Sequence, residues 1–355
     1  MRHKGNRGFK GRVLLWPLGI LYGLVMWGRN VMYNLGILPS WKAPVPVISI
    51  GNLSVGGTGK TPIAAYVMSF LAEKKIRVAY LSRGYGRRTK GYLKVDPKVG
   101  DAEHYGDEAC QIAANFPDLP VAVCEDRKVG IQHLVEEEGA ELVVLDDAFQ
   151  HRAVARDLNI VVIDANRPYW QDMILPAGRL REFAAGLNRA DVLVVNKIRT
   201  SRDISIFMSK LASWGGPFVF CQPTQTMIRS FHSPTATAIS DLSEQNVVAF
   251  AGIGNPTYFF DQLGQTGMKI LDHRIYKDHH PYIPKNLEDL EKILSTLPLG
   301  TILLTTEKDY FRMRNQPWTR AFTHLPLYYV DMQLTWPGVE AGEDNLLVQS
   351  LLQFA

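Results

Sequence analysis

The chain has 355 residues, of which 46% are hydrophobic and 21% are charged. These ordinary globular values exclude disorder, collagen-like repeats and coiled coil as the main architecture, and the length suggests two domains. Three cysteines, none of them in a CxxC pair, are too few for a disulfide framework; they favour a reducing compartment and argue against a cysteine-built metal site.

The net charge of +4 is unevenly distributed along the chain. Residues 1–42 carry seven Lys and Arg residues and no Asp or Glu, so subtracting this +7 from the total leaves −3 on the rest. A mildly acidic body lacks the basic face that a binder of duplex nucleic acid needs. No nucleic-acid partner is therefore expected.

An apolar segment follows the first basic residues. Residues 13–28 form an uncharged run of 16 residues that ends at Arg29, whereas a spanning helix needs about 20 apolar residues. The run contains Pro17, and no small-residue cleavage site typical of a signal peptide follows it. Its tryptophans and tyrosines, with flanking basic residues, favour a helix that lies in a membrane interface. A true membrane span and a helix packed on the protein's own core are the alternatives.

A phosphate-binding loop is predicted after the first strand. Residues 46–50 read as a short buried strand, residues 51–62 (GNLSVGGTGKTP) are rich in glycine, and residues 63–74 have helical character. This order is the context of a P-loop, in which Lys60 would reach the β- and γ-phosphates and Thr61 would bind Mg²⁺. The alternative is a glycine-rich turn without nucleotide. The strict pattern GxxxxGK[ST] fails only at its first position, and the predicted nucleotide-binding residues are Ser54, Val55, Gly56, Gly57, Thr58, Gly59, Lys60 and Thr61.

Two aspartates follow another buried strand. The apolar run at 141–145 ends at Asp146 and Asp147. Carboxylates at the carboxyl end of a parallel strand lie beside the phosphate site and can hold Mg²⁺, although Asp147 could instead cap the next helix. Further strand-like runs alternate with helical stretches, which predicts a parallel sheet with helices on both faces; these runs are 78–82, 160–164 and 191–196.

The run VVNKIR at 194–199 resembles a guanine-reading Asn-Lys-x-Asp sequence, but Arg199 stands in place of the Asp. The carboxylate that would read guanine is missing. The sequence therefore predicts ATP, not GTP, as the nucleotide.

Several stretches along the chain form a characteristic set: GNLSVGGTGKTP at 51–62, LSRGYG at 81–86, GDE at 106–108, DDAFQH at 146–151, LPAG at 175–178 with LRE at 180–182, DH at 278–279 and TTEKD at 305–309. Together they resemble the tetraacyldisaccharide 4'-kinase family, the lipid A 4'-kinases. The resemblance covers nearly the whole chain in order. It implies ATP-dependent phosphorylation of the 4'-hydroxyl of an acylated glucosamine disaccharide 1-phosphate. It also implies a monotopic enzyme on the cytoplasmic leaflet of the bacterial inner membrane, and no obligate protein partner is inferred.

The resemblance also implies the fold class, α/β with two α/β/α lobes, the first with a P-loop NTPase-like parallel sheet. A short linker would join the lobes, and lobe closure would complete the site. On this chain the parts would be a membrane-interface helix at 1–38, a P-loop lobe at 39–222, a linker at 223–240 and a second α/β lobe at 241–355.

The family motifs carry candidate site residues over to this chain. Asp107 would accept the proton of the sugar hydroxyl, and His279, in the other lobe, would hydrogen-bond and orient it; the reverse assignment stays open, as does a plain surface histidine. Arg127 would stabilise charge on the transferring group or bind the substrate's 1-phosphate, unless it forms a surface ion pair. Nucleotide contacts would come from Glu307, Lys308 and Asp309, and substrate contacts from Glu108, His151, Arg181 and Glu182.

The chain departs from the family pattern at two places. Ala148 takes the place of a usual glycine; if that position needs a positive φ, Ala costs on the order of 1 kcal/mol and re-aims Asp147. Phe183 replaces the Pro after Leu-Arg-Glu, and Arg179 stands where Pro is common. We expect changes in loop geometry, not in the reaction.

Two other classes of function stay open. A P-loop NTPase that acts on a protein or metal partner would be supported by clustered Cys and His spacing, which the sequence lacks. A membrane-attached nucleotide sensor needs no base, whereas Asp107, Asp146 and Asp147 give the predicted site an acidic character.

Overall fold

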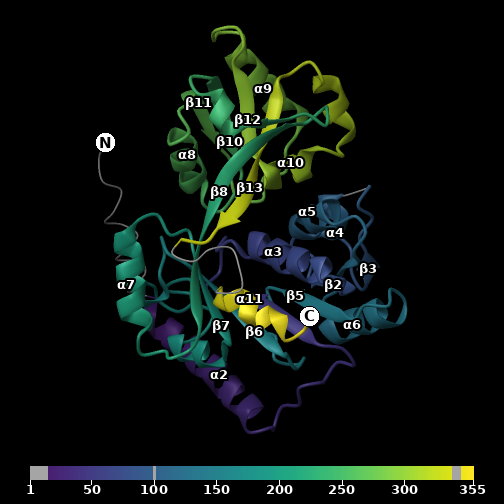
Figure 1. The fold of residues 1–355 in the computed structure, drawn as a ribbon, viewed down its shortest axis with the longest axis vertical. Coiled ribbons are helices and arrows are strands. Elements are labelled where there is room, and N and C mark those ends of the chain that lie inside the picture. Colours follow the sequence, from purple (N-terminus) through teal and green to yellow (C-terminus); the bar gives the residue numbers. More distant parts are fainter. Residues whose placement is uncertain (1–14, 99–100, 338–344) are drawn as a thin grey trace. The chain divides into compact units, whose positions relative to one another are not determined.

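The computed structural model describes residues 15–98, 101–337 and 345–355 (Figure 1). The fold is mixed α/β with a large, mostly parallel sheet. The chain packs as two compact units: unit 1 consists of the residues up to 83, 126–222 and 335–355, and unit 2 consists of 84–125 and 223–334. The division falls within two strands, β8 (Phe218–Ser230) and β13 (Leu327–Thr335).

Unit 1 contains a parallel sheet with the strand order β8-β7-β6-β1-β5-β2. The central strand β1 (Val47–Gly51) pairs with β5 (Leu142–Asp146) on one side and β6 (Leu158–Asp164) on the other. Beyond β5 lies β2 (Val78–Ser82), and beyond β6 lies β7 (Val192–Asn196), which also pairs with β8. Runs of Val, Ile and Leu that are buried on both faces explain why these strands pair in parallel. The predicted parallel sheet is confirmed.

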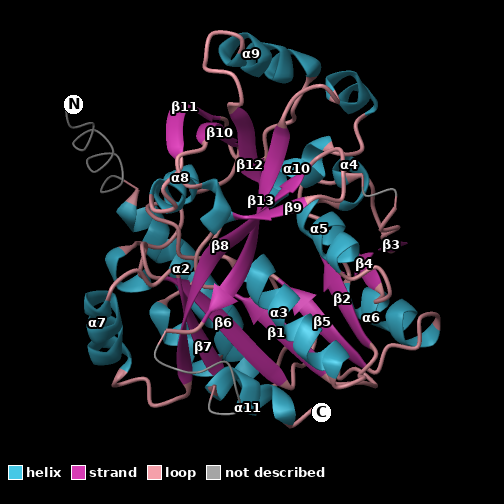
Figure 2. Cartoon of the chain, turned by 45° about the horizontal axis from the view of Figure 1, so that its top comes forward, coloured by secondary structure: helices cyan, strands magenta, loops and turns pink. Residues whose placement is uncertain are grey.

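Helices follow these strands as the sequence predicted. Helix α3 (Lys60–Glu73) comes directly after the loop that follows β1, and its Ile63, Val67 and Leu71 are buried at helical spacing. Figure 2 shows α3 in front of the strands β6, β1 and β5. The other helices of unit 1 are α6 (Arg127–Glu136), α7 (Ser201–Leu211), α11 (Leu346–Leu352) and the 3₁₀ helices η1 (Tyr169–Gln171) and η2 (Ala184–Arg189).

The apolar N-terminal segment forms helix α2 (Trp16–Asn34), which packs on unit 1 through two glycines. Gly19 and Gly23 are its buried residues, and a Cβ atom at Gly23 would lie 2.6 Å from Cζ of Phe183. Large apolar side chains on the rest of the helix are exposed; they include Leu18, Leu21, Leu24, Val25 and Trp27. The helix therefore packs on the protein along one narrow side only.

Within the described residues, we find no helix with both the length and the apolar character needed to cross a membrane. Residues 1–14, which contain most of the N-terminal basic residues and the start of the predicted interface helix, lie outside the described part of the chain.

In unit 2, β10 (Asn246–Ala251) lies between β11 (Lys269–Ile275) and β12 (Ile302–Thr306), and β12 pairs with β13; all three pairings are parallel. Helices cover both faces of β10. Val247 and Ala249 share a core cluster with Phe259 and Leu263 of α8, whereas Val248 and Phe250 on the opposite face pack with α9. The helices α8 and α9 span Pro256–Gly264 and Pro284–Leu294.

The remaining elements of unit 2 come from two parts of the chain. Residues 84–125 supply β3 (Leu93–Lys94), α4 (Ala102–Tyr105), α5 (Asp107–Asn115) and β4 (Val121–Val123). Residues 223–334 add β9 (Ala236–Ala238), η3 (Ile239–Leu242), α10 (Glu307–Met313) and η4 (Pro317–Phe322). The predicted domain boundaries at 38, 222 and 240 stay a prediction, and the compact units interleave along the chain.

Candidate active site

The glycine loop (residues 51–59) connects β1 to α3 and exposes its backbone at the middle. Gly56 has φ +109, and a Cβ atom at Gly56 or Gly57 would meet nothing within 4 Å. Gly59 has φ +90, and a Cβ atom there would overlap the side-chain nitrogen of Asn196. Only glycine fits at Gly59, and open space lies in front of Gly56 and Gly57. Such exposed backbone can receive an anion beside the N-terminus of α3.

Lys60 and Arg181 converge on one carboxylate, that of Asp147. Lys60 Nζ lies 3.3 Å from Asp147 Oδ1, and Arg181 Nη1 donates to the two Asp147 oxygens at 3.0 and 2.9 Å. Burial raises the pKa of Asp147, but the charges of Lys60 and Arg181 outweigh it and lower the pKa below its ordinary value. The structure therefore brings together three residues that the sequence had assigned separately to catalysis, metal and substrate.

The left-handed residue after β5 is Asp147, with φ +48, and not Ala148. The concern that Ala148 would need a positive φ is therefore wrong. Ala148 is fully buried, and Asp, one of the non-glycine residues that tolerate this region best, adopts the left-handed conformation.

Arg127 and His151 lie close to the end of β5. Arg127 is only 3% exposed and donates from Nη2 to the backbone carbonyl of Asp146 at 3.2 Å, so the surface ion pair considered for it is wrong. His151 is half-buried; burial, reinforced by the charges of Arg127 and Arg156, lowers its pKa to about 4. His151 is therefore neutral at physiological pH.

Asn196 and Lys197 hold the glycine loop in place through hydrogen bonds to its backbone carbonyls. Asn196 Nδ2 donates to the carbonyl of Thr58 at 2.9 Å, and Lys197 Nζ donates to the carbonyl of Gly57 at 2.7 Å and to Asp164 at 2.6 Å. In the sequence these residues stand out only as part of an incomplete guanine motif, which does not predict their contacts with the glycine loop. Their place at the end of β7, in the same sheet as β1, was the available signal.

Glu182 is placed in the interior of unit 1, where it is 2% exposed. Its oxygens accept hydrogen bonds from Arg189 at 2.8 and 2.9 Å, from Asn30 at 2.8 Å and from Gln150 at 3.0 Å. A carboxylate with four such contacts orients its neighbours.

In unit 2 the structure brings Asp107 and His279 together. His279 Nδ1 lies 2.9 Å from Asp107 Oδ2, which confirms the predicted hydrogen bond. Asp107 begins α5, and His279 adopts φ +57, an uncommon conformation for a residue with a side chain. The expectation that the two residues belong to different lobes is wrong for the compact units, because residues 84–125 pack in unit 2.

Arg312 completes this cluster and was missed in the sequence. Its Nε donates to Asp107 Oδ2 at 2.6 Å, and its Nη1 donates to the carbonyl of Gly252 at 2.6 Å and to Asp309 at 2.9 Å. Burial raises the pKa of Asp107, but the hydrogen bond from His279 and the charge of Arg312 lower it far below its usual range. Asp107 is therefore ionised at any physiological pH.

The three residues of the TTEKD motif that were assigned to nucleotide have protein partners in unit 2. Asp309 is fully buried in the first turn of α10, where its backbone nitrogen donates to Oγ1 of the N-cap residue Thr306 at 3.2 Å. Its carboxylate accepts from the backbone nitrogen of Gly252 at 3.0 Å. Lys308 Nζ donates to Glu108 Oε1 at 2.5 Å. The oxygens of Glu307 accept from the amides of Gln111 at 2.6 Å and Asn115 at 3.3 Å. The contacts of Lys308 and Glu307 connect α10 to α5.

The comparisons with known proteins decide the family. A family model described as tetraacyldisaccharide-1-P 4'-kinase (LpxK) matches residues 11–351. The chain belongs to this family. A tetraacyldisaccharide 4'-kinase of Pelodictyon phaeoclathratiforme is 37% identical over 358 residues, 97% of each chain, and one of Chlorobaculum tepidum is 39% identical over 317 residues, 86% of this chain and 87% of the relative. A crystal structure of the "apo" form of LpxK from Aquifex aeolicus in complex with ATP aligns with a TM-score of 0.75 and 30% identity, over 97% of this chain and 99% of that one.

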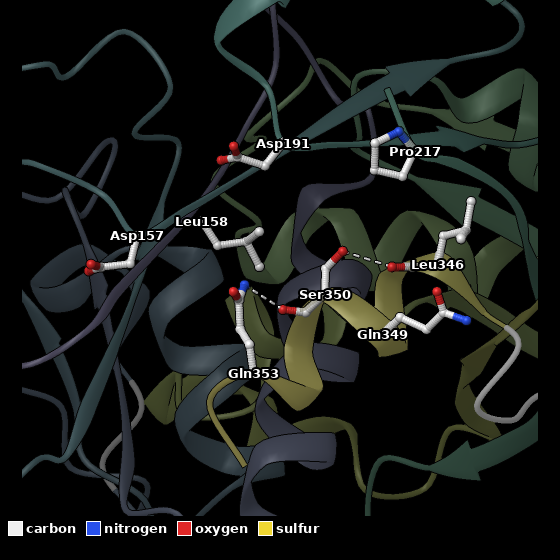
Figure 3. A pocket seen from close by; sticks show the side chains of 8 residues that line it. All are labelled: Asp157, Leu158, Asp191, Pro217, Leu346, Gln349, Ser350 and Gln353. Atoms are coloured by element: carbon white, nitrogen blue, oxygen red, sulfur yellow. Dashed lines mark hydrogen bonds between the residues drawn. The ribbon is translucent and has the colours of Figure 1, made fainter. Parts of the chain in front are cut away.

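A pocket of about 390 Å³ in this LpxK-family chain lies away from the glycine loop, next to α11 (Figure 3). Asp157 and Asp191 at its rim precede β6 and β7, so the pocket is at the amino-terminal edge of the parallel sheet. Both carboxylates accept backbone hydrogen bonds, from Val47 at 2.8 Å and from Asn159 at 2.7 Å. In α/β sheets ligands bind at the opposite, carboxyl edge, so we assign no part of the site to this pocket.

Among the described residues, there is no group of three or more His, Cys, Asp or Glu side chains placed to hold a metal ion. A metal would therefore need oxygen ligands from elsewhere, such as a hydroxyl group or a phosphate.

Glu307 makes stability depend on pH. Burial and the charge of Asp331 raise its pKa from 4.5 to about 7. Between pH 4.5 and about 7 the carboxyl group of Glu307 loses its proton in the unfolded chain and keeps it in the folded chain, so the free energy of unfolding falls as pH rises.

We predict that Glu307→Gln raises the apparent melting temperature at pH 8 by roughly a few degrees and leaves it nearly unchanged at pH 5. As a control, Glu288→Gln on the exposed side of α9 should show no such difference. Equal shifts of the Glu307→Gln variant at both pH values would refute the prediction.

Proposed function

We propose that this chain transfers the γ-phosphoryl group of ATP to the 4'-hydroxyl of an acylated glucosamine disaccharide 1-phosphate, a step in lipid A synthesis. The observation that carries the proposal is membership of the tetraacyldisaccharide 4'-kinase family over residues 11–351. This membership favours the kinase over an NTPase with a protein or metal partner and over a nucleotide sensor.

In this proposal the glycine loop is a P-loop, unit 1 holds ATP, and the chain has two lobes joined by a short linker. The open space at Gly56 and Gly57 supports the fit, because a triphosphate needs exposed backbone nitrogens at this position. Lys60 stands at the first turn of α3 with a side chain that is 14% exposed, where it would reach the β- and γ-phosphates. The solved LpxK from Aquifex aeolicus is described in complex with ATP, which agrees with this assignment.

We propose Mg²⁺ as the metal, held by oxygen atoms of Thr61, Asp146 and Asp147. The donor set fits, because Mg²⁺ prefers oxygen ligands and binds to few protein groups when phosphates supply the others. Asp147 already carries Lys60 and Arg181 at its oxygens. Bound Mg²⁺ would neutralise charge on the phosphates. Arg127 would act through the backbone of Asp146, to which it donates.

For the acceptor hydroxyl we propose Asp107 as the proton acceptor. His279 and Arg312 both contact Oδ2, which fixes the carboxylate and leaves Oδ1 for the sugar hydroxyl. A carboxylate of low pKa is a weak base, but the loose transition state of phosphoryl transfer needs orientation of the hydroxyl more than early proton removal. Glu108, His151 and Arg181 stay proposed substrate contacts.

We further propose that α2 attaches the enzyme to the cytoplasmic leaflet of the bacterial inner membrane. The apolar side chains exposed along α2 support this, since contiguous exposed apolar surface marks a membrane or partner site. Detergent should release the protein from membranes, whereas high salt should only weaken attachment, because apolar burial is not screened. A tag before Met1 that protease cleaves from outside spheroplasts would contradict the proposal.

Lys60→Ala tests the nucleotide site. We predict a loss of at least about 100-fold in kcat, because the charge at the γ-phosphate is no longer compensated. The assay follows label from ATP into a bisphosphorylated lipid, with an acylated disaccharide 1-phosphate as acceptor and GTP as competitor. Lys74→Ala, at the exposed residue directly after the same helix, is the matched control and should stay within a few-fold of wild type. Activity of Lys60→Ala near the wild-type level, or faster turnover with GTP, would count against the assignment.

A double-mutant cycle tests the pair Asp107 and His279. We predict that Asp107→Ala costs more kcat than His279→Ala and that the double variant is hardly worse than Asp107→Ala, because groups that act as a unit are not additive. ATP affinity should change little in all three variants, because neither residue belongs to the glycine loop. If the losses of kcat in the two single variants multiply in the double variant, the two residues act independently. If His279→Ala loses more kcat than Asp107→Ala, the histidine and not the aspartate is the proton acceptor.

A further inference from the structure

A series of polar side chains leads from helix α2 into the interior of unit 1. Asn30 on α2 donates from Nδ2 to Glu182 Oε2 at 2.8 Å. The other oxygen of Glu182 accepts from Gln150 Nε2 at 3.0 Å, and Arg189 holds both oxygens from one side. Because Glu182 is almost fully buried, each lost donor leaves charge that water cannot solvate. The orientation of Glu182 therefore depends on α2.

From Gln150 the series continues to the proposed phosphate site. Gln150 Oε1 accepts from Arg181 Nη1 at 3.3 Å, and this same nitrogen donates to both oxygens of Asp147. Asp147 in turn pairs with Lys60 at 3.3 Å. Every step from Asn30 to Lys60 is thus a hydrogen bond or an ion pair within unit 1.

A second branch leaves the same glutamine. Gln150 Nε2 also donates to the carbonyl of Asn52 at 2.9 Å, and the buried amide of Asn52 donates to Thr58 Oγ1 at 2.9 Å. Asn52 and Thr58 are both part of the glycine loop. A shift of Gln150 would therefore move the loop as well as Arg181.

The polar side of α2 is docked by further specific contacts. Arg29 donates to the carbonyl of Gln150 at 3.1 Å, and Arg152 donates to the carbonyl of Asn30 and to the side chain of Asn34, both at 2.8 Å. A helix that only inserts apolar side chains into a membrane would not need such contacts. Their geometry indicates a second role for α2.

We propose that Asn30 is a positioning residue of the nucleotide site: through Glu182 and Gln150 it holds Arg181, Asp147 and the glycine loop in the arrangement that binds the triphosphate. The proposal rests on the proposed ATP site. Residues that orient metal ligands through hydrogen bonds typically change metal affinity or activity by about 10–100-fold when they are replaced, and we expect an effect of the same order for Asn30.

The test exchanges a polar and an apolar residue on the two sides of α2. Asn30→Leu removes the donor and keeps the size of the side chain, whereas Leu24→Asn makes the reverse change on the exposed side. We would measure binding of a non-hydrolysable ATP analogue in detergent without lipid substrate, kcat and KM for ATP, and flotation with phosphatidylethanolamine–phosphatidylglycerol vesicles. Asn30→Leu should weaken binding of the analogue about tenfold and leave flotation intact. Leu24→Asn should weaken flotation and leave analogue binding unchanged.

Asn30→Gln keeps an amide donor and should recover most of the analogue affinity, which separates lost positioning from a misfolded helix. The proposal is overturned if Asn30→Leu binds the analogue within twofold of wild type, or if Asn30→Gln loses as much affinity as Asn30→Leu. A wild-type protein that binds the analogue but does not phosphorylate the lipid would contradict the proposed function and leave the Asn30 result valid.

Discussion

The proposed nucleotide site depends on the carboxylate of Asp147, which forms ion pairs with Lys60 and Arg181. It stands in a left-handed turn after β5, and it meets Lys60 from α3 and Arg181 from the segment that follows the LPAG sequence. The Asp147 side chain is 34% exposed, and removing either cation would leave its charge less neutralised and would raise its pKa toward the ordinary value. The glycine loop, β5 and the 180–182 segment are therefore fixed together by one group.

Unit 2 also contains a carboxylate, that of Asp107, that is held by basic side chains. Asp107 is a buried carboxylate at the start of a helix, and Arg312 and His279 keep it ionised. In unit 1 both oxygens of the carboxylate are occupied by cations, whereas in unit 2 the two partners meet at one oxygen. This difference fits the proposed roles, in which Asp147 would organise a phosphate site and Asp107 would offer its other oxygen, Oδ1, to a hydroxyl group.

Much of the fold could be predicted because its signals are local. Apolar runs such as 142–145 predict buried parallel strands, and the glycine loop with its Lys-Thr pair predicts the turn into α3. The residues that the sequence did not reveal act over long separations. Arg312 meets Asp107 across 205 residues, and Asn30 meets Glu182 across 152. No local pattern marks such partners. The family motif predicted Glu182 as a substrate contact, but it did not predict that this residue is buried in the interior of unit 1.

In the proposed reaction, Asp147 and Arg181 act as one functional unit in the transfer of phosphate from ATP to the lipid. The direct measurement is kcat for labelled lipid formation by wild type, Asp147→Asn, Arg181→Gln and the double variant. We expect Asp147→Asn to lower kcat by about 100-fold and the double variant to be within a few-fold of it, because contacting residues couple. Losses that multiply in the double variant, or an Asp147→Asn enzyme with nearly wild-type kcat, would contradict this account.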